Sequence, residues 1–138
     1  MLTLASVSKR FGERTVLNAV SLEIAAGEYV AILGESGIGK STLLNVIAGL
    51  EPVDSGKIVF QERDLTALDD DALTLLRRES FGFVFQAFHV LPQLTVEQNV
   101  ALPLLLREIS SSEKTAKALA SVGLAGREAS MPRELSGG

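Results

Sequence analysis

A glycine-rich loop between an apolar run and an amphipathic segment constrains this chain more than any other feature. Residues 29–50 read YVAILGESGIGKSTLLNVIAGL. Residues 30–33 form a short unbroken apolar run, which is typical of a strand buried on both faces. Residues 34–41 fit the phosphate-loop pattern G-x-x-x-x-G-K-[ST]. Apolar residues then recur at helical spacing as far as Gly49, where a helix can end. The loop therefore follows a predicted strand and opens a predicted helix.

The three glycines of this loop explain how it could bind an anion. Gly34, Gly37 and Gly39 allow backbone conformations that other residues rarely adopt, and they let the chain approach a ligand closely. The amides of residues 36–40 can then converge on phosphate oxygens. The helix that begins near Lys40 adds the positive end of its dipole.

The residues at the start of that helix predict a bound nucleotide and a cation. Lys40 is expected to reach the β- and γ-phosphates of ATP, and Ser41 to supply an oxygen to Mg²⁺. Thr42 can add a hydroxyl to the α-phosphate. The alternative is a glycine-rich turn before an ordinary helix, but this motif in its strand–loop–helix context favours nucleotide binding.

Composition excludes several other classes of function. The chain has 138 residues, enough for one modest domain, and a net charge of −4, which gives no basic surface for nucleic acid. It contains no cysteine, so disulfides and thiolate metal sites are excluded. No apolar run approaches the ~20 residues of a membrane span, and no signal peptide is evident. These properties favour a cytoplasmic protein.

The order of patterns along the chain predicts an α/β fold with two sub-domains. Alternating apolar residues before residue 25 predict two or three antiparallel strands that flank the phosphate-loop core. Residues 81–85 (FGFVF) predict another buried strand. From about residue 91 the patterns are helical. We therefore expect an ATP-binding core sub-domain over residues 1–90 and a helical sub-domain over residues 91–138, both incomplete.

Helix-capping patterns support the helical assignments. Three consecutive aspartates, residues 69–71, fit the cap and first turn of a helix better than a metal site, because consecutive residues do not share a helix face. Thr95 with Gln98 fits a capping box that opens a helix through about residue 102. Pro103 is expected to restart a helix, and Ser110 precedes another.

Four motifs in the same order resemble those of the ATP-binding-cassette (ABC) ATPases. They are the aromatic Phe11, the phosphate loop over residues 34–42, Gln86, and the sequence LSGG at residues 135–138. The last resembles the family signature L-S-G-G-Q without its glutamine. The resemblance covers the whole chain and implies a P-loop NTPase core with a helical sub-domain.

The resemblance also implies roles for these residues. Phe11 would stack on adenine, with core packing as the alternative. Gln86 would contact Mg²⁺ and the attacking water, with an ordinary strand-end glutamine as the alternative. Ser136, Gly137 and Gly138 would close on the γ-phosphate of ATP held by a second ATPase subunit, which implies a head-to-tail dimer.

The expected site combines both lines of reasoning. Lys40 and Gln86 are the expected catalytic residues, and Ser41 and Gln86 the expected Mg²⁺ ligands. The residues expected to contact ATP come from the aromatic position, the loop and the signature: Phe11, Gly34, Glu35, Ser36, Gly37, Ile38, Gly39, Lys40, Ser41, Thr42, Ser136, Gly137 and Gly138. Ile38 departs from the family pattern, which usually has a small residue there, although its backbone amide can still serve.

Residues 82–92 and 95–103 resemble more narrowly the bacterial group that includes lipoprotein-release and macrolide-export ATPases. This resemblance implies transmembrane permease subunits as partners and a location on the inner face of the cell membrane. The apolar residues 88–91 would lie near the surface that receives the permease, or be buried in the helical sub-domain.

The family's second half does not appear in this sequence. We find no apolar strand ending in Asp-Glu, so the second Mg²⁺ ligand and the general base are missing. We therefore expect an N-terminal fragment that is nearly inactive alone, with a sheet edge left exposed beside residues 30–33. Two alternatives stay open: a non-hydrolysing module that dimerises with ATP, and a soluble ABC ATPase without a transport role.

Overall fold

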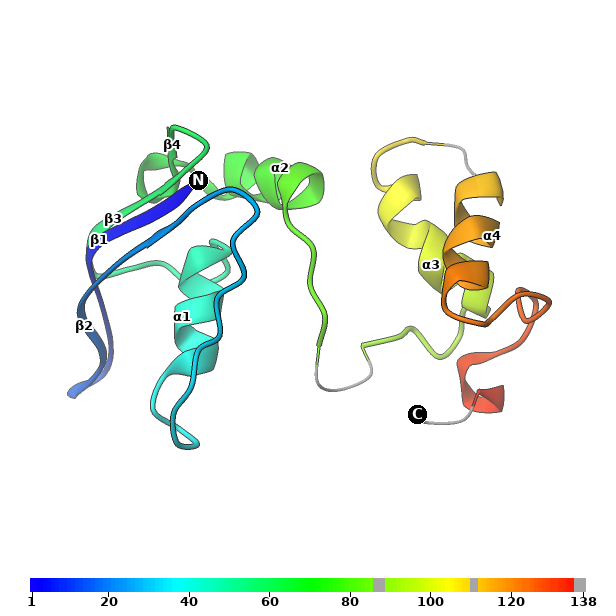
Figure 1. The fold of residues 1–138 in the computed structure, drawn as a ribbon, viewed down its shortest axis with the longest axis horizontal. Coiled ribbons are helices and arrows are strands. Elements are labelled where there is room, and N and C mark those ends of the chain that lie inside the picture. Colours follow the sequence, from blue (N-terminus) through cyan, green and yellow to red (C-terminus); the bar gives the residue numbers. More distant parts are fainter. Residues whose placement is uncertain (86–88, 110–111, 136–138) are drawn as a thin grey trace. The chain divides into compact units, whose positions relative to one another are not determined.

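The computed structural model describes residues 1–85, 89–109 and 112–135, and it divides into two compact units (Figure 1). The first unit comprises Met1–Phe81 and the second Gly82–Gly138. The expected boundary near residue 90, between the sub-domains of a cassette, stays a prediction.

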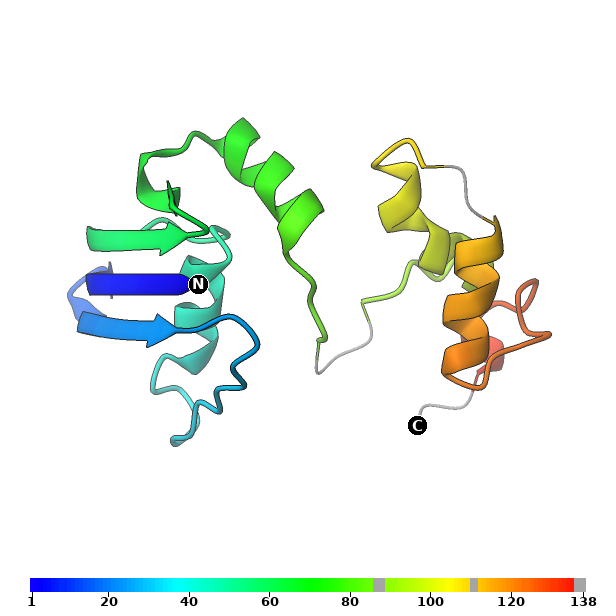
Figure 2. The ribbon, with the colours of Figure 1, turned by 45° about the horizontal axis from the view of Figure 1, so that its top comes forward.

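The first unit is built on a four-stranded antiparallel sheet with the order β2-β1-β3-β4, whose longer strands lie side by side in Figure 2. The strands are β1 (Leu2–Phe11), β2 (Arg14–Ile24), β3 (Ser55–Phe60) and β4 (Arg63–Asp64). In β1, Leu4 pairs with Leu22 on one side and with Ile58 on the other. The expected antiparallel strands before residue 25 are therefore confirmed.

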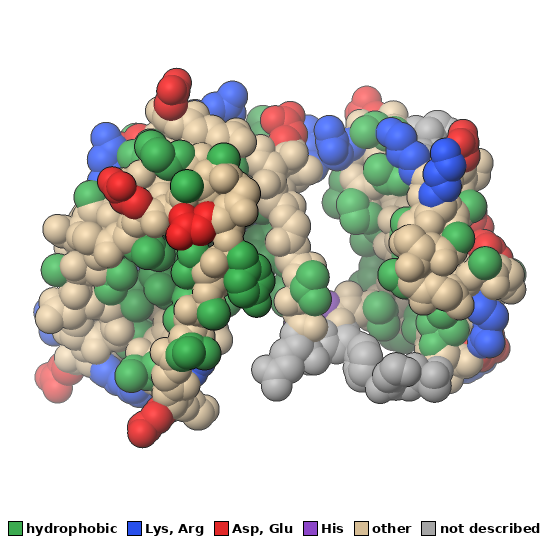
Figure 3. Space-filling view, viewed as in Figure 1, with side chains coloured by type: hydrophobic (Ala, Val, Ile, Leu, Met, Phe, Trp, Pro, Cys, Tyr) green, Lys and Arg blue, Asp and Glu red, His purple; other side chains and the backbone are tan. Residues whose placement is uncertain are grey.

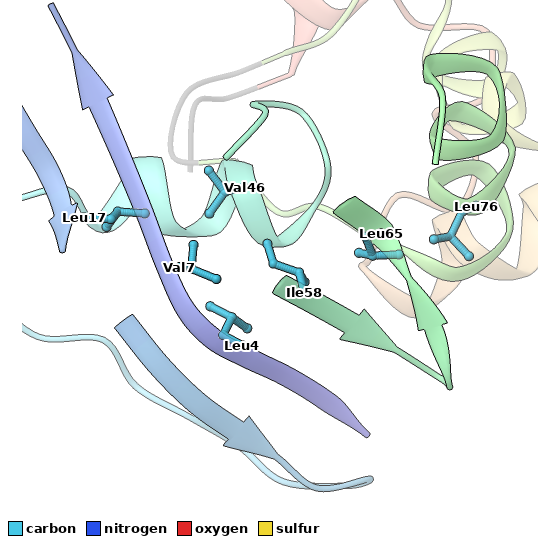
Figure 4. Packing of buried hydrophobic residues seen from close by; sticks show 7 residues of the cluster. All are labelled: Leu4, Val7, Leu17, Val46, Ile58, Leu65 and Leu76. Atoms are coloured by element: carbon cyan, nitrogen blue, oxygen red, sulfur yellow. The ribbon is translucent and has the colours of Figure 1, made fainter. Parts of the chain in front are cut away.

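A small hydrophobic core joins this sheet to the helices of the same unit. The helical elements are α1 (Lys40–Ile47), the 3-10 helix η1 (Leu65–Ala67) and α2 (Asp70–Ser80). Every strand except β4 and each of these helical elements contributes a buried side chain: Leu4, Val7, Leu17, Val46, Ile58, Leu65 and Leu76 (Figure 4). Each such side chain stabilises the unit by about 1.5–3 kcal/mol relative to an exposed position. This core fixes α1, and with it the loop that precedes α1.

Capping residues set the ends of α1 and α2 as the sequence predicts. Gly49 has φ = 64°, and the amide of Leu50 donates to the Asn45 carbonyl at 2.9 Å, which closes α1. The Asp69 carboxylate accepts from the amide of Ala72 at 2.8 Å, which caps α2. Arg77 of α2 donates to the Gly49 carbonyl at 2.6 Å and so links the two helix ends.

Two apolar runs expected to be buried strands are not strands in this structure. Residues 30–33 belong to no sheet, and Leu33 is 89% exposed. Residues 81–85 are also unpaired, and the side chain of Val84 is fully exposed. A buried strand needs hydrogen-bonded neighbours on its edges, and none of the described residues supplies one. Hydrophobic side chains consequently lie on the surface along the segment between β2 and α1 (Figure 3).

The second unit is helical, with α3 (Val96–Leu105), α4 (Ser112–Ser121) and the 3-10 helix η2 (Pro132–Glu134). The Thr95–Gln98 capping box is present and opens α3. The expectation that Pro103 restarts a helix is wrong, because α3 continues through it. The amide of Val96 donates to the Ser130 carbonyl at 2.9 Å, which ties the later loop to α3. Ser110 lies outside the described residues.

Among the helices of the described segments, none combines the length and the apolar character that crossing a membrane requires.

Candidate nucleotide-binding site

The backbone of the phosphate loop uses its three glycines as the sequence predicts. Gly34, Gly37 and Gly39 have φ values of 154°, 78° and 110°, a region that side chains with a Cβ rarely occupy. Gly39 directly precedes α1, so the loop enters the helix without a side-chain cap. The first amides of α1 therefore have no capping side chain to accept from them.

The loop presents a group of unused hydrogen-bond donors. In the part of the chain that the structure describes, no hydrogen bond uses the backbone N–H groups of residues 36, 37 and 39, and the turn at residues 36 and 37 brings the N–H of Ile38 toward the Glu35 carbonyl. These residues are exposed, except Gly39, which is half-buried. Free amides next to a helix N-terminus form the type of concavity that binds phosphate. No acidic residue occupies the first turn of α1, so no carboxylate of the helix competes with an anion.

Lys40 lies across this loop. Its ammonium donates to the Gly34 carbonyl at 2.8 Å and to the Glu35 carbonyl at 2.6 Å. The side chain is thus held beside the free amides by the loop's own backbone. A cation in this position adds charge to the donor group and favours a phosphate over a neutral ligand.

The turn between β1 and β2 brings Phe11 to the same end of the unit as the phosphate loop. Phe11 pairs with Arg14 across the two strands, and the Arg14 guanidinium donates to the Gly37 carbonyl at 2.9 Å. Figure 1 shows the hairpin end and the loop before α1 at the same end of the first unit. Sequence reasoning missed Arg14, because the contact joins residues 23 positions apart and no motif marks it.

Phe11 is available to a ligand but has one neighbour on its ring. The side chain is 49% exposed and does not belong to the hydrophobic core. The Lys9 ammonium lies 5.2 Å from the ring centroid, and it is held there by an ion pair with Glu51 at 2.7 Å. This cation–π contact occupies one region of the ring surface and leaves exposed surface for a planar base.

The expected cation ligands are only partly described. Ser41 is exposed in the first turn of α1, beside Lys40, and Thr42 is half-buried there. Gln86 lies outside the described residues, as do Ser136, Gly137 and Gly138. Within the described segments, no group of three or more His, Cys, Asp or Glu residues could hold a metal ion. The hydroxyl of Ser41 is a ligand type that Mg²⁺ accepts, with phosphate oxygens and water as the usual companions.

A separate cavity of about 420 Å³ lies at the other end of α1. Its lining includes Val46, Gly49, Glu51 and Leu73, and it contains none of the predicted site residues. The phosphate loop is instead an exposed segment that carries the backbone donors described above. We therefore place the candidate site at the loop.

The sequence profile of the family described as "ABC transporter" matches residues 17–138, which include the phosphate loop and α1. The chain belongs to the ABC transporter family. The family membership that the motifs predicted is thereby confirmed over most of the chain.

Several relatives are similar in sequence to this chain along its full length. The chain is 44% identical to the pyoverdine export ATP-binding/permease protein of Pseudomonas aeruginosa and 41% identical to the macrolide export ATP-binding/permease protein of Marinobacter nauticus. Each match covers 100% of this chain and 22% of the relative. The chain therefore spans about a fifth of the length of these export proteins.

Solved structures give the ABC transporter fold independently. The chain is 38% identical to a dimeric ATP-binding cassette in a post-hydrolysis state bound to ADP and Pi, with a TM-score of 0.85. The match covers 99% of this chain and 64% of that cassette. The expected α/β P-loop NTPase fold is thus confirmed.

Proposed function

We propose that this chain is part of the nucleotide-binding subunit of an ABC transporter, and that the full-length protein binds and hydrolyses Mg-ATP to drive transport across a membrane. One observation carries the proposal: the backbone amides of residues 36–39 lie beside a helix N-terminus, and the Lys40 ammonium is hydrogen-bonded to the same loop. This arrangement matches the charge and the multiple acceptor oxygens of a triphosphate.

Each described residue has a definite task in this function. The amides of residues 36–39 hold phosphate oxygens, and Lys40 exchanges its two backbone acceptors for the β- and γ-phosphates. Phe11 offers its exposed ring to the adenine, a contact of about 1–3 kcal/mol by analogy with base stacking on aromatic side chains in nucleic-acid complexes. Ser41, together with Gln86 from outside the described residues, would hold Mg²⁺, which would supply positive charge to neutralise the phosphates.

The descriptions of the relatives support a proposal about partners. The matched cassette is described as dimeric, and the export relatives are described as ATP-binding/permease proteins. We propose that this protein likewise pairs head-to-tail with a second ATPase subunit, with Ser136, Gly137 and Gly138 meeting the partner's ATP. Transmembrane permease segments or subunits would then hold it at the cytoplasmic face of the membrane.

The decisive test measures ATP binding and turnover by the full-length protein with Lys40→Met. Loss of a charge-assisted contact costs about 1.5–3 kcal/mol, so ATP affinity should fall about 10- to 100-fold and turnover should be lost. Lys117→Met is the matched control. Its ammonium pairs with Glu113 on the surface of α4, and the variant should bind and hydrolyse ATP as the wild type does.

Two other results would change the conclusion. A wild-type protein that binds no ATP in the presence of Mg²⁺ would refute nucleotide binding. A wild-type protein that binds ATP and dimerises without turning it over would favour the non-hydrolysing dimerisation module.

A further inference from the structure

A residue at the start of β2 forms a hydrogen bond with the phosphate loop. Arg14 is the first residue of β2, and its guanidinium donates to the Gly37 carbonyl at 2.9 Å. Lys40 binds the carbonyls of residues 34 and 35. The two cations therefore hold different peptide units of the same loop.

The geometry of a peptide bond makes the Arg14 contact informative. In a trans peptide, the C=O and the N–H of one unit point in opposite directions, and the unit rotates as a rigid plane. The carbonyl of Gly37 and the amide of Ile38 belong to one such unit. Since the carbonyl points to Arg14, the Ile38 N–H points away from it, toward the side of the turn at residues 36 and 37.

A second contact comes from the same end of β2. A Cβ added to Gly39 would lie 2.7 Å from Val16 Cγ1 and 3.1 Å from the Val16 carbonyl oxygen. Arg14 and Val16 both lie within the first three residues of β2, and Val16 is the residue at which the register between β1 and β2 shifts. The loop thus contacts β2 at Gly37 and at Gly39, the residues on either side of Ile38.

We propose that Arg14 is a positioning residue for nucleotide binding. By holding the Gly37 carbonyl, it fixes the Ile38 amide in the orientation that donates to a phosphate oxygen of ATP. Gly37 has no side chain to restrict its ψ angle, so without Arg14 this peptide is free to flip and present its carbonyl to the phosphates. The inference rests on the proposed function. It assigns a task to a residue outside the loop, and it explains why the bulky Ile38 is tolerated, because only its backbone is used.

The experiment compares four variants of the full-length protein. Arg14→Met removes both the donor and the charge, Arg14→Gln keeps a neutral donor, and Arg14→Lys keeps both. Arg63→Met removes an exposed arginine of the same unit, in β4, and is the control. The measurements are the ATP dissociation constant, from a fluorescent analogue and competition, and the thermal midpoint without nucleotide.

A positioning role for Arg14 predicts one pattern of results. Arg14→Met should bind ATP about 5- to 10-fold more weakly, the range expected for the loss of one hydrogen bond that orients the loop without contacting the nucleotide. Arg14→Gln and Arg14→Lys should recover most of the affinity, and Arg63→Met should bind as the wild type does. All four thermal midpoints should stay close to that of the wild type, since Arg14 is exposed.

Three results would overturn the inference. Unchanged ATP affinity in Arg14→Met would show that ATP binding does not depend on the hydrogen bond from Arg14 to the loop. If Arg14→Gln lost as much ATP affinity as Arg14→Met, Arg14 would act through charge attraction and not through orientation of the peptide. A thermal midpoint that falls in parallel with affinity would show a general loss of stability. Failure of the wild type to bind ATP would instead refute the proposed function itself.

Discussion

Gly39 is the residue where loop, helix and strand meet most tightly. It has φ = 110°, and a Cβ there would lie 2.7 Å from Val16 Cγ1. Gly39→Ala should therefore lower the free energy of unfolding by about 2 kcal/mol or more, from backbone strain and overpacking together. Denaturant titration of the purified protein measures this loss.

Gly37→Ala is the matched control for this residue. Gly37 also has a positive φ of 78°, but a Cβ there would meet nothing within 4 Å. The free energy of unfolding of this variant should fall only by the cost of backbone strain, about 1–2 kcal/mol. Adding Val16→Ala to Gly39→Ala should restore part of the stability. Equal losses for the two glycine variants would contradict the crowding at Val16.

At the scale of elements, α2 depends on one capping carboxylate among three neighbouring aspartates. Asp69 accepts from the Ala72 amide at 2.8 Å, whereas Asp70 and Asp71 lie in the first turn. Asp69→Ala should lower the free energy of unfolding by about 1 kcal/mol, and Asp71→Ala by about 0.3–1 kcal/mol through the helix dipole alone. Thermal unfolding of both variants gives the comparison. A larger loss in Asp71→Ala would mean that the cap is assigned to the wrong residue.

The elements that sequence predicted correctly are those with local signals. The start of α1 at Lys40, the cap at Asp69 and the box at Thr95 each depend on residues within one helical turn. Residues 30–33 carry a strand pattern, but a strand also needs a partner, and the pattern does not say which segment supplies it. Likewise, nothing in the sequence indicates that Arg14 meets Gly37, because that contact depends on how β2 and α1 pack.

At the scale of the whole molecule, the first unit leaves an apolar segment without a partner. Leu33 is 89% exposed and Tyr29 is 93% exposed, beside a core that is otherwise formed. Exposed unpaired apolar runs are sites where further chain or another molecule can add a strand. Because this chain covers 64% of the matched cassette, further sequence is one source of such a partner.

This argument predicts different hydrogen exchange in two forms of the protein. In a segment limited to residues 1–138, the amides of residues 30–33 should exchange nearly as fast as in an unfolded peptide, because they donate to no backbone acceptor among the described residues. In the full-length protein they should be protected by 100-fold or more, on the order of the ~3 kcal/mol that local opening of a paired strand costs. The amides of β1, paired on both sides in this structure, are the internal reference and should be protected in both forms. Fast exchange of residues 30–33 in the full-length protein, with β1 protected, would mean that this apolar run is not a core strand, and its hydrophobic side chains would then need a partner from another molecule.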